Sequence, residues 1–458
     1  MKTRLTLAGL LGLALGLAVL LGGCRKEPAP APGDPTSKPP PKAAADAKPL
    51  TICWAQWAPA DGLQELGNEF QKETGIAVKV RQIPWSDFQT QVFLEFGQKQ
   101  TDFDLVVGDS QWIGRGATKG FYVDLTDWLP TAVDLKTLSP RALKYLCEYP
   151  PGSGRYYAAP CETDAVGFAY RKDWFEDAAE KAAFKAKFGY DLAIPKTWKQ
   201  FRDVAAFFHR PDQKRYGCAL LTGRGYDSLI MGFQHFLWCF GGTWGDAAGY
   251  KAEGFVNNAG AVEGLTFMVE LLKYAPPGAE NYDYGKTPEV LENGSTAMIM
   301  DYFAFFPGLA GKMGDKVGFF RSPSLTDDKP PLISLGGQGI SISAKVSPER
   351  QALAKKFVAW FLQEKVQKQW ITKPAGFTAN AAILNSPDFR QASPYNAPFA
   401  DSLEYLQDFW NVPQYNELLA AAQRLVGEAV DGKLTPKAAL DALAKEHEAI
   451  FREAGLLK

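Results

Sequence analysis

The sequence predicts an α/β protein whose folded body has two lobes. About 410 of the 458 residues follow an N-terminal stretch unsuited to folding, and that length exceeds what one hydrophobic core usually covers. The body opens with strand and helix patterns in alternation, which is typical of a parallel sheet covered by helices. A tryptophan follows each of the first three predicted strands, which indicates a ligand site at one edge of that sheet.

The N-terminus carries the pattern of an export signal. Two basic residues precede an apolar run from Leu5 to Leu21, as in a secretory signal peptide. The sequence LGGC at positions 21–24 resembles the lipobox of bacterial lipoproteins, in which the cysteine is acylated and becomes the new N-terminus. We therefore expect residues 1–23 to be a lipoprotein signal peptide and Cys24 to carry the lipid. An uncleaved anchor helix and plain secretion are the alternatives.

Residues 24–48 are predicted to form a disordered tether. Their proline, alanine, lysine and aspartate bury too little apolar surface to fold, and the prolines keep the chain extended. Several acyl chains together anchor a protein firmly, whereas one chain anchors it only marginally. We expect the body to be exported and held by this tether at a bacterial membrane, on the periplasmic or cell-surface face.

Composition excludes several classes of function. The net charge is −1 and the pI about 6.4, with lysine and arginine spread along the chain, so we expect no nucleic-acid partner. Only three histidines and no C-x-x-C pair occur, so we expect no metal site and no cofactor. We expect the remaining cysteines to be mostly buried free thiols, with at most one disulfide among them. These are Cys53, Cys147, Cys161, Cys218 and Cys239.

The first part of the body is predicted to alternate strands and helices. Asp61 is expected to cap the first helix and Gly75 to end it. The apolar patterns predict strands over 50–57, 76–83 and 103–109, and helices over 60–75 and 85–99.

Aromatic and polar side chains follow the ends of these strands. The carboxyl ends of parallel strands meet at one edge of a sheet, and ligands bind there. Trp57, Trp85 and Trp112 come after the first, second and third strand, and their flat faces suit a ligand with apolar C–H faces. Asp109 and Gln111 stand beside the third strand end. The alternative is that the tryptophans close the core as a lid.

The later part of the chain mixes strands with longer helices. Two strands, 155–162 and 165–171, are expected to be joined by a turn at Thr163 and Asp164. A short buried strand over 297–300 precedes a carboxylate and aromatic residues, and a glycine-rich turn leads into a strand within 336–344. From position 393 onward the chain is predicted to be largely helical.

Several segments in order resemble the extracellular solute-binding proteins of bacterial ABC importers, family 1, the maltose-type, carbohydrate-binding cluster. The resemblance extends from about Leu50 to the end of the chain. It is carried by ADGLQELGNEFQKETGIAVKV, FDLVVGDSQW, YYAAPCETDAVGFAYRKDWF, IPKTWKQF, FGG, NGSTAMIMDYFAFF, GGQGISISA and AKKFVAWFLQEKVQKQW. The predicted lipid anchor agrees with it, since such proteins are often tethered lipoproteins.

The resemblance implies a type II periplasmic-binding-protein-like fold, in which two lobes of sheet and helices hold the ligand in the cleft between them. Hinge closure would present the ligand to ABC transporter permease subunits, and we expect a monomer. By position, lobe 1 is residues 49–162 plus 322–363, and lobe 2 is residues 163–321 plus 364–458.

The resemblance also extends the set of candidate ligand contacts. Glu162, Thr163 and Asp164 lie at the first crossing between lobes, where they either bond the ligand or brace the hinge. Gln111 and Trp112 stand where the maltose-type pattern has an Asp-Arg pair, which favours stacking over charge there. The remaining candidates are Trp244, Asp301, Tyr302, Phe303, Gly337 and Gln338, and a core position is the alternative for the aromatic ones.

The sequence thus predicts a carbohydrate-binding lipoprotein of an ABC importer that is not an enzyme. A polyol, a polyamine or another small solute bound by the same fold is the alternative. An exported glycan-active enzyme with Asp109 and Glu162 as acid and base is a remoter one, because carboxylates in a sugar cleft are equally expected for binding alone.

Overall fold

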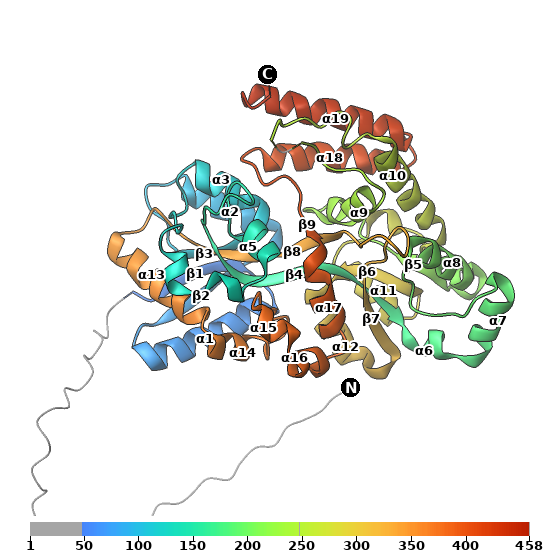
Figure 1. The fold of residues 1–458 in the computed structure, drawn as a ribbon, viewed down its shortest axis with the longest axis horizontal. Helices are drawn as coiled ribbons and strands as arrows, with labels where there is room; N and C mark the ends of the chain where they lie inside the picture. The colour runs from blue at the N-terminus through green and yellow to red at the C-terminus, as the bar shows by residue number, and fades with distance from the viewer. Residues whose placement is uncertain (1–47, 247, 458) are drawn as a thin grey trace, which may run out of the picture. The chain divides into compact units, whose positions relative to one another are not determined.

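Three parallel strands form one end of the sheet, as the sequence predicts. In the computed structural model, which describes residues 48–246 and 248–457, β1 (Leu50–Ala55) pairs in parallel with both β2 (Val78–Ile83) and β3 (Leu105–Asp109). Helices α1 (Ala58–Thr74) and α2 (Trp85–Phe96) connect them (Figure 1). The predicted signal peptide, Cys24 and all but the last residue of the predicted tether lie outside the described residues.

Two long strands carry the sheet from this end to the other. The order is β2-β1-β3-β8-β4-β6-β5, with β7 also on β4 and β9 also on β8 (Figure 1). Residues 159–165 of β4 pair with β8, whereas residues 166–171 pair with β6 and β7. The other strands are β4 (Ala159–Arg171), β5 (Tyr216–Ala219), β6 (Thr296–Tyr302), β7 (Val317–Arg321), β8 (Ile333–Ile342) and β9 (Leu406–Gln407).

Two predictions for this central region were wrong. Thr163 and Asp164 do not form a turn, because both pair with β8 inside the continuous strand β4. The glycines at 336 and 337 likewise lie within β8 rather than in a turn. Gly337 has a φ of 92°, and a Cβ there would lie 2.3 Å from the carbonyl oxygen of Glu162. Glycine is therefore required for the two strands to approach so closely.

Helices cover the sheet and make up most of the C-terminal part, as predicted. Helices α18 (Tyr415–Val430) and α19 (Pro436–Glu453) pack against each other. No helix within the described residues is long and apolar enough to cross a membrane. The others are α3 (Ile113–Thr118), α4 (Leu129–Ala132), α5 (Pro140–Leu146), α6 (Lys172–Glu176), α7 (Ala178–Phe188), α8 (Trp198–Phe208), α9 (Ser228–Cys239), α10 (Ala259–Leu271), α11 (Lys286–Glu292), α12 (Phe306–Met313), α13 (Pro348–Phe361), α14 (Glu364–Trp370), α15 (Ala381–Asn385), α16 (Pro387–Ala392) and α17 (Asn396–Ser402).

The ends of helix α1 follow the sequence only in part. Gly75 ends it with a φ of 77°, as expected for a left-handed C-cap. Asp61 is not its cap, because the helix already begins at Ala58, helped by Pro59 in its first turn. The Asp61 carboxylate instead accepts a 2.7 Å hydrogen bond from Gln82 of β2.

Much of the aromatic content lies in the core. Trp54, Trp198 and Trp370 are among the largest fully buried side chains.

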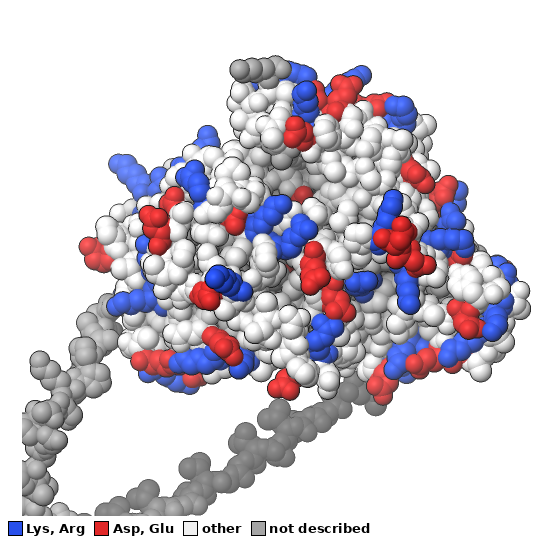
Figure 2. All heavy atoms as spheres, viewed as in Figure 1, with Lys and Arg blue, Asp and Glu red and all other residues white. Residues whose placement is uncertain are grey.

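All five cysteines of the described residues are free and buried, in agreement with the prediction of mostly buried free thiols. On the face shown in Figure 2, acidic and basic side chains are interspersed, in keeping with a net charge of −1.

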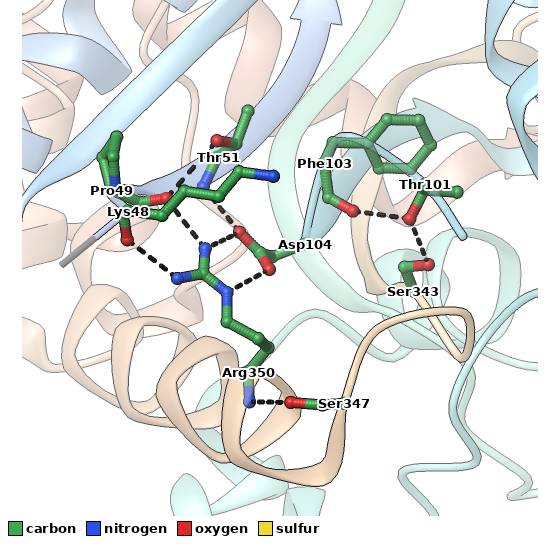
Figure 3. Close-up of polar contacts among 9 residues, drawn as sticks. All are labelled: Lys48, Pro49, Thr51, Thr101, Phe103, Asp104, Ser343, Ser347 and Arg350. Carbon is green, nitrogen blue, oxygen red and sulfur yellow. Dashed lines mark hydrogen bonds and ion pairs between the residues drawn. The ribbon is translucent and has the colours of Figure 1, made fainter.

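One buried ion pair fastens the start of the folded chain. Arg350 in the first turn of α13 donates to both carboxylate oxygens of Asp104, which is 3% exposed (Figure 3). The same guanidinium donates to the carbonyl oxygens of Lys48 and Pro49, each at 2.8 Å. Asp104 also accepts a 2.8 Å hydrogen bond from the Thr51 amide. A fork of this kind pairs a buried carboxylate with a fixed cation and holds β1 against α13.

Candidate functional site

Residues from both ends of the sheet line a cavity of about 450 Å³. Its volume lies within the usual range for small-molecule sites, which is roughly 300–1,000 Å³. Its wall combines aromatic rings with carboxyl groups. The aromatic members are Trp57, Trp85, Tyr226, Tyr284, Tyr302 and Phe305, and the acidic members are Asp109, Asp164, Asp227 and Asp283.

Side chains reach the cavity from both ends of the sheet. Trp57 and Trp85 follow β1 and β2, while Asp109 ends β3 and is followed by Gln111. These positions lie at the same edge of the sheet, because β1 pairs in parallel with both β2 and β3 and the carboxyl ends of the three strands therefore lie side by side. From the other end come the loops before α9 and α11 and the end of β6. Residues 335–338 of β8 pass between the two groups.

Asp109 is the centre of a hydrogen-bond network that joins the two groups. Its carboxylate accepts a hydrogen bond from the Tyr226 hydroxyl and another, 2.8 Å long, from the Gln338 amide. Burial raises the pKa of Asp109, although these two hydrogen bonds oppose the rise. Tyr226 has a φ of 61°, a left-handed conformation that is unusual for a bulky residue. Such a residue persists only where its surroundings hold it, and at this position they hold its hydroxyl on Asp109.

Asp227 is a second acid on the cavity wall. It precedes α9, but its side chain makes no capping hydrogen bond to that helix. Its Oδ1 accepts a 2.6 Å hydrogen bond from the Tyr284 hydroxyl. Burial, with the nearby charge of Asp109, raises the pKa of Asp227 to about 7. This carboxyl group therefore changes charge near neutral pH.

A third acid, Asp408, does not line the cavity but contacts Gln111, which does. Gln111 donates a 2.7 Å hydrogen bond to Asp408, which follows β9. Burial raises the pKa of Asp408 to about 7. Farther along the same segment, the Asn411 side chain accepts a 2.8 Å hydrogen bond from the Gly114 amide. The segment after β9 thus braces the loop after β3.

The aromatic rings form two walls. Trp57 and Trp85 meet edge to face, with centroids 5.3 Å apart at 81°, and Tyr226 lies 6.1 Å from Trp85. On the other wall, Tyr284 and Phe305 are stacked with centroids 5.7 Å apart at 11°. Trp57 and Trp85 are only half-buried, so they retain apolar surface for a ligand.

The structure brings one group of the predicted site residues together around the cavity. Asp164 accepts hydrogen bonds from two backbone amides, of Ala165 at 2.8 Å and Ala304 at 3.2 Å, so it also holds the chain after β6. Burial raises its pKa well above the usual range. The predicted residues on the cavity wall are Trp57, Trp85, Asp109, Gln111, Asp164, Tyr302, Gly337 and Gln338.

The other predicted site residues lie in the core, away from the cavity wall. Trp112 is 1% exposed and packs on Phe88 and Phe93. Trp244 packs on Phe409 and donates a 3.1 Å hydrogen bond to Gln234. The remaining members of this group are the buried residues Glu162, Thr163, Asp301 and Phe303.

Glu162 and Asp301 differ in their hydrogen bonding. Asp301 accepts a 2.5 Å hydrogen bond from Thr287, whereas both carboxyl oxygens of Glu162 lack a donor among the described residues. Burial, reinforced by the charges of Asp164 and Asp109, raises the pKa of Glu162 well above its usual range.

Five residues of the cavity wall were not predicted from the sequence: Tyr226, Asp227, Asp283, Tyr284 and Phe305. Four of these residues occur in two short motifs, GYDS at 225–228 and YDYG at 282–285, each with a tyrosine–aspartate pair next to glycine. The repetition of this pattern was the available signal. Among the described residues, no cluster of side chains suited to holding a metal ion occurs.

Comparison with known proteins agrees with this geometry. The mannitol-binding protein of Pseudomonas aeruginosa is 24% identical over 339 residues, covering 67% of this chain and 71% of that protein. The galactooligosaccharide-binding protein of Bacillus subtilis is 20% identical over 398 residues, covering 86% and 87%. A ribitol-bound ABC transporter solute-binding protein from Agrobacterium radiobacter has a TM-score of 0.74 at 27% identity, covering 88% of this chain and 100% of that one.

These similarities confirm the predicted α/β fold of the type II periplasmic-binding-protein class. The family of bacterial extracellular solute-binding proteins matches residues 54–368, which is more than half of the chain. The cavity, the crossing strands and this match lead to one assignment. The chain belongs to the family of bacterial extracellular solute-binding proteins.

Proposed function

We propose that this protein captures a sugar or a polyol in the cavity and delivers it to the permease of an ABC importer. The observation that carries the proposal is the wall itself, which sets six aromatic side chains among four carboxyl groups. Aromatic faces cover the C–H side of a sugar, and carboxyl and amide groups bond its hydroxyls. The relatives that bind mannitol, ribitol and galactooligosaccharide support this choice.

Capture would proceed by closure of two lobes. The lobes are proposed as residues 49–162 plus 322–363 and residues 163–321 plus 364–458. The hydrogen bond from Tyr226 to Asp109 links the two walls of the cavity and would form only when they are close. A ligand drives closure by binding the closed form more tightly than the open form. The permease would then recognise the closed form.

Export and anchoring complete the proposal. The signal peptide over 1–23, a lipid on Cys24 and the tether over 24–48 would hold the body at a bacterial membrane, where a monomer meets its permease. A catalytic role is not proposed. Asp109 and Glu162 would have to face the same ligand to act as acid and base, and Glu162 is fully buried outside the cavity wall.

A thermal-shift screen of the purified protein tests the proposal. The panel contains monosaccharides, oligosaccharides, polyols and polyamines. A ligand that binds only the folded state at a hundredfold excess over Kd contributes about 2.7 kcal/mol, which raises the melting temperature by a few degrees. We expect a shift with a polyhydroxylated compound. A shift confined to compounds without hydroxyl groups would overturn the proposed ligand class.

A further inference from the structure

The cavity contains several carboxyl groups and no base. Asp109, Asp164, Asp227 and Asp283 line it, whereas no lysine, arginine or histidine of the described residues does. Asp109, Asp164 and Asp227 are buried, whereas Asp283 is exposed. Burial of uncompensated carboxylates is unfavourable, so the three buried ones call for a partner.

None of these carboxyl groups has a cationic partner among the described residues. Asp109 accepts from the Tyr226 hydroxyl and the Gln338 amide, and Asp227 from the Tyr284 hydroxyl. The other two acids accept only backbone N–H groups. Asp164 accepts those of residues 165 and 304, and Asp283 those of residues 285 and 286. Every donor found is neutral.

The loops that form the site do contain bases, but these are engaged elsewhere. Arg224 donates to Asp431 and, at 2.9 Å, to the carbonyl oxygen of Gly427 on α18. Lys286 pairs with Glu289 at 2.7 Å. Each base lies within three residues of a cavity acid in the sequence, yet its charge is satisfied by a different carboxylate.

A buried carboxylate elsewhere in the same chain does have a cationic partner. Asp104 is 3% exposed and receives the guanidinium of Arg350 (Figure 3). Asp109 and Asp227 are each 7% exposed and receive no such cation. Unlike Asp104, Asp109 and Asp227 face a cavity, from which a ligand can supply a cation.

Gln338 gives an independent indication of a missing donor. It is 5% exposed and lines the cavity, and its amide nitrogen is used on Asp109. Its Oε1 is buried and accepts no hydrogen bond from any described residue. Native proteins rarely leave such an acceptor unpaired, so it points to a donor on the ligand. The faces of Trp85 and Tyr284 would also attract a cation.

We propose that the ligand is a polyhydroxylated molecule carrying a protonated amine, an amino sugar or an amino polyol, whose ammonium group binds Asp227, Asp109 and the Gln338 Oε1. This inference rests on the proposed function and narrows it. Three donors of an ammonium group match three acceptors here. The hydroxyl groups of the ligand remain for the amides and the other carboxyl groups.

Isothermal titration calorimetry of the purified protein tests the inference. The probes are glucosamine, galactosamine and mannosamine, each with its parent hexose and its N-acetyl derivative, together with mannitol, putrescine and spermidine. Acetylation removes the charge and keeps the hydroxyls. We expect one amino sugar to bind roughly tenfold or more tightly than its parent and its acetyl derivative, as for a hydrogen bond to a charged group.

The variant Asp227→Asn removes the charge of this side chain with little change in its shape. It keeps an acceptor for Tyr284, and we expect it to remove most of the preference for the amine, because the affinity for the amino sugar should fall by a larger factor than the affinity for the parent hexose. Asp191→Asn, which removes an acid with a 79% exposed side chain, is the control and should keep the preference. Equal or tighter binding of a neutral sugar or polyol by the unmodified protein would overturn the inference and leave the proposed function standing. Binding of polyamines alone, or of no probe at all, would overturn both.

Discussion

At the scale of residues, the tryptophans show what a sequence can and cannot locate. Each of Trp57, Trp85 and Trp112 follows a strand end, and parallel pairing was enough to predict that all three gather at one edge. The direction of each side chain was not predictable. Trp112 folds back over Gly108 of its own strand, where a Cβ would lie 2.7 Å from the indole, and so enters the core. A tryptophan on the cavity wall and a core tryptophan therefore carry the same sequence signal.

This difference predicts opposite behaviour of two substitutions. Trp57→Ala removes a half-buried ring from the cavity wall, so we expect at least about tenfold weaker ligand binding and little change in unfolding. Trp112→Ala leaves a hole beside Phe88 and Phe93, so we expect the free energy of unfolding to fall by about 3–5 kcal/mol. Urea unfolding and ligand titration of both variants would check this. Loss of stability in the first variant but not the second would refute the assignment.

At the scale of elements, one strand was harder to predict than the helices. The strand–helix alternation over residues 50–109 and the strand over 296–302 followed from apolar periodicity. The region of β4 was predicted as two strands joined by a turn, because Thr163 and Asp164 are polar residues of a kind common in turns. Their pairing with the glycines of β8 is a long-range contact, and no local pattern contains it.

The loop before α9 gives a prediction at this scale. Arg224 ties the loop that carries Tyr226 and Asp227 to α18, through Asp431 and a backbone carbonyl. We expect Arg224→Ala to weaken ligand binding severalfold, because the loop would lose its fixed position. An exposed ion pair contributes only about 0–1 kcal/mol, so the free energy of unfolding should change little.

Arg424→Ala provides the matched control. It breaks another exposed pair on the same helix, with Glu446, and touches no cavity loop. Calorimetric titration of both variants with the ligand found in the screen would compare them. An equal loss of affinity in the two variants would mean that α18 as a whole, and not the anchored loop, supports the site.

At the scale of the whole molecule, buried acids and histidines set how stability depends on pH. The pKa values of Asp227 and Asp408 are raised to about 7, against roughly 3.9 in an unfolded chain. The folded state therefore holds more protons, and this stabilisation is lost as the pH rises through 7. His235 and His447, with pKa values lowered to about 3 and about 4, act in the opposite sense, but only below roughly pH 6.5.

We therefore expect Asp227 and Asp408 together to raise the free energy of unfolding by about 1–2 kcal/mol as the pH falls from 8 to 6.5, and the other buried acids with raised pKa values to add to this rise. Below that range, protonation of the unfolded histidines should flatten the curve. Urea unfolding at a series of pH values measures the effect, and Asp227→Asn should make the rise smaller. A free energy that falls with acidification from pH 8 would show that these acids are ionised in the folded protein.

The central claim is that a polyhydroxylated ligand binds in the cavity between the two ends of the sheet. A crystal structure of the protein with the compound that gives the largest thermal shift tests it most directly. The account predicts density for the ligand between Trp57 and Tyr284, with polar contacts to Asp109 and Asp227. Density for the ligand at any other place, with this cavity closed around water, would contradict the account.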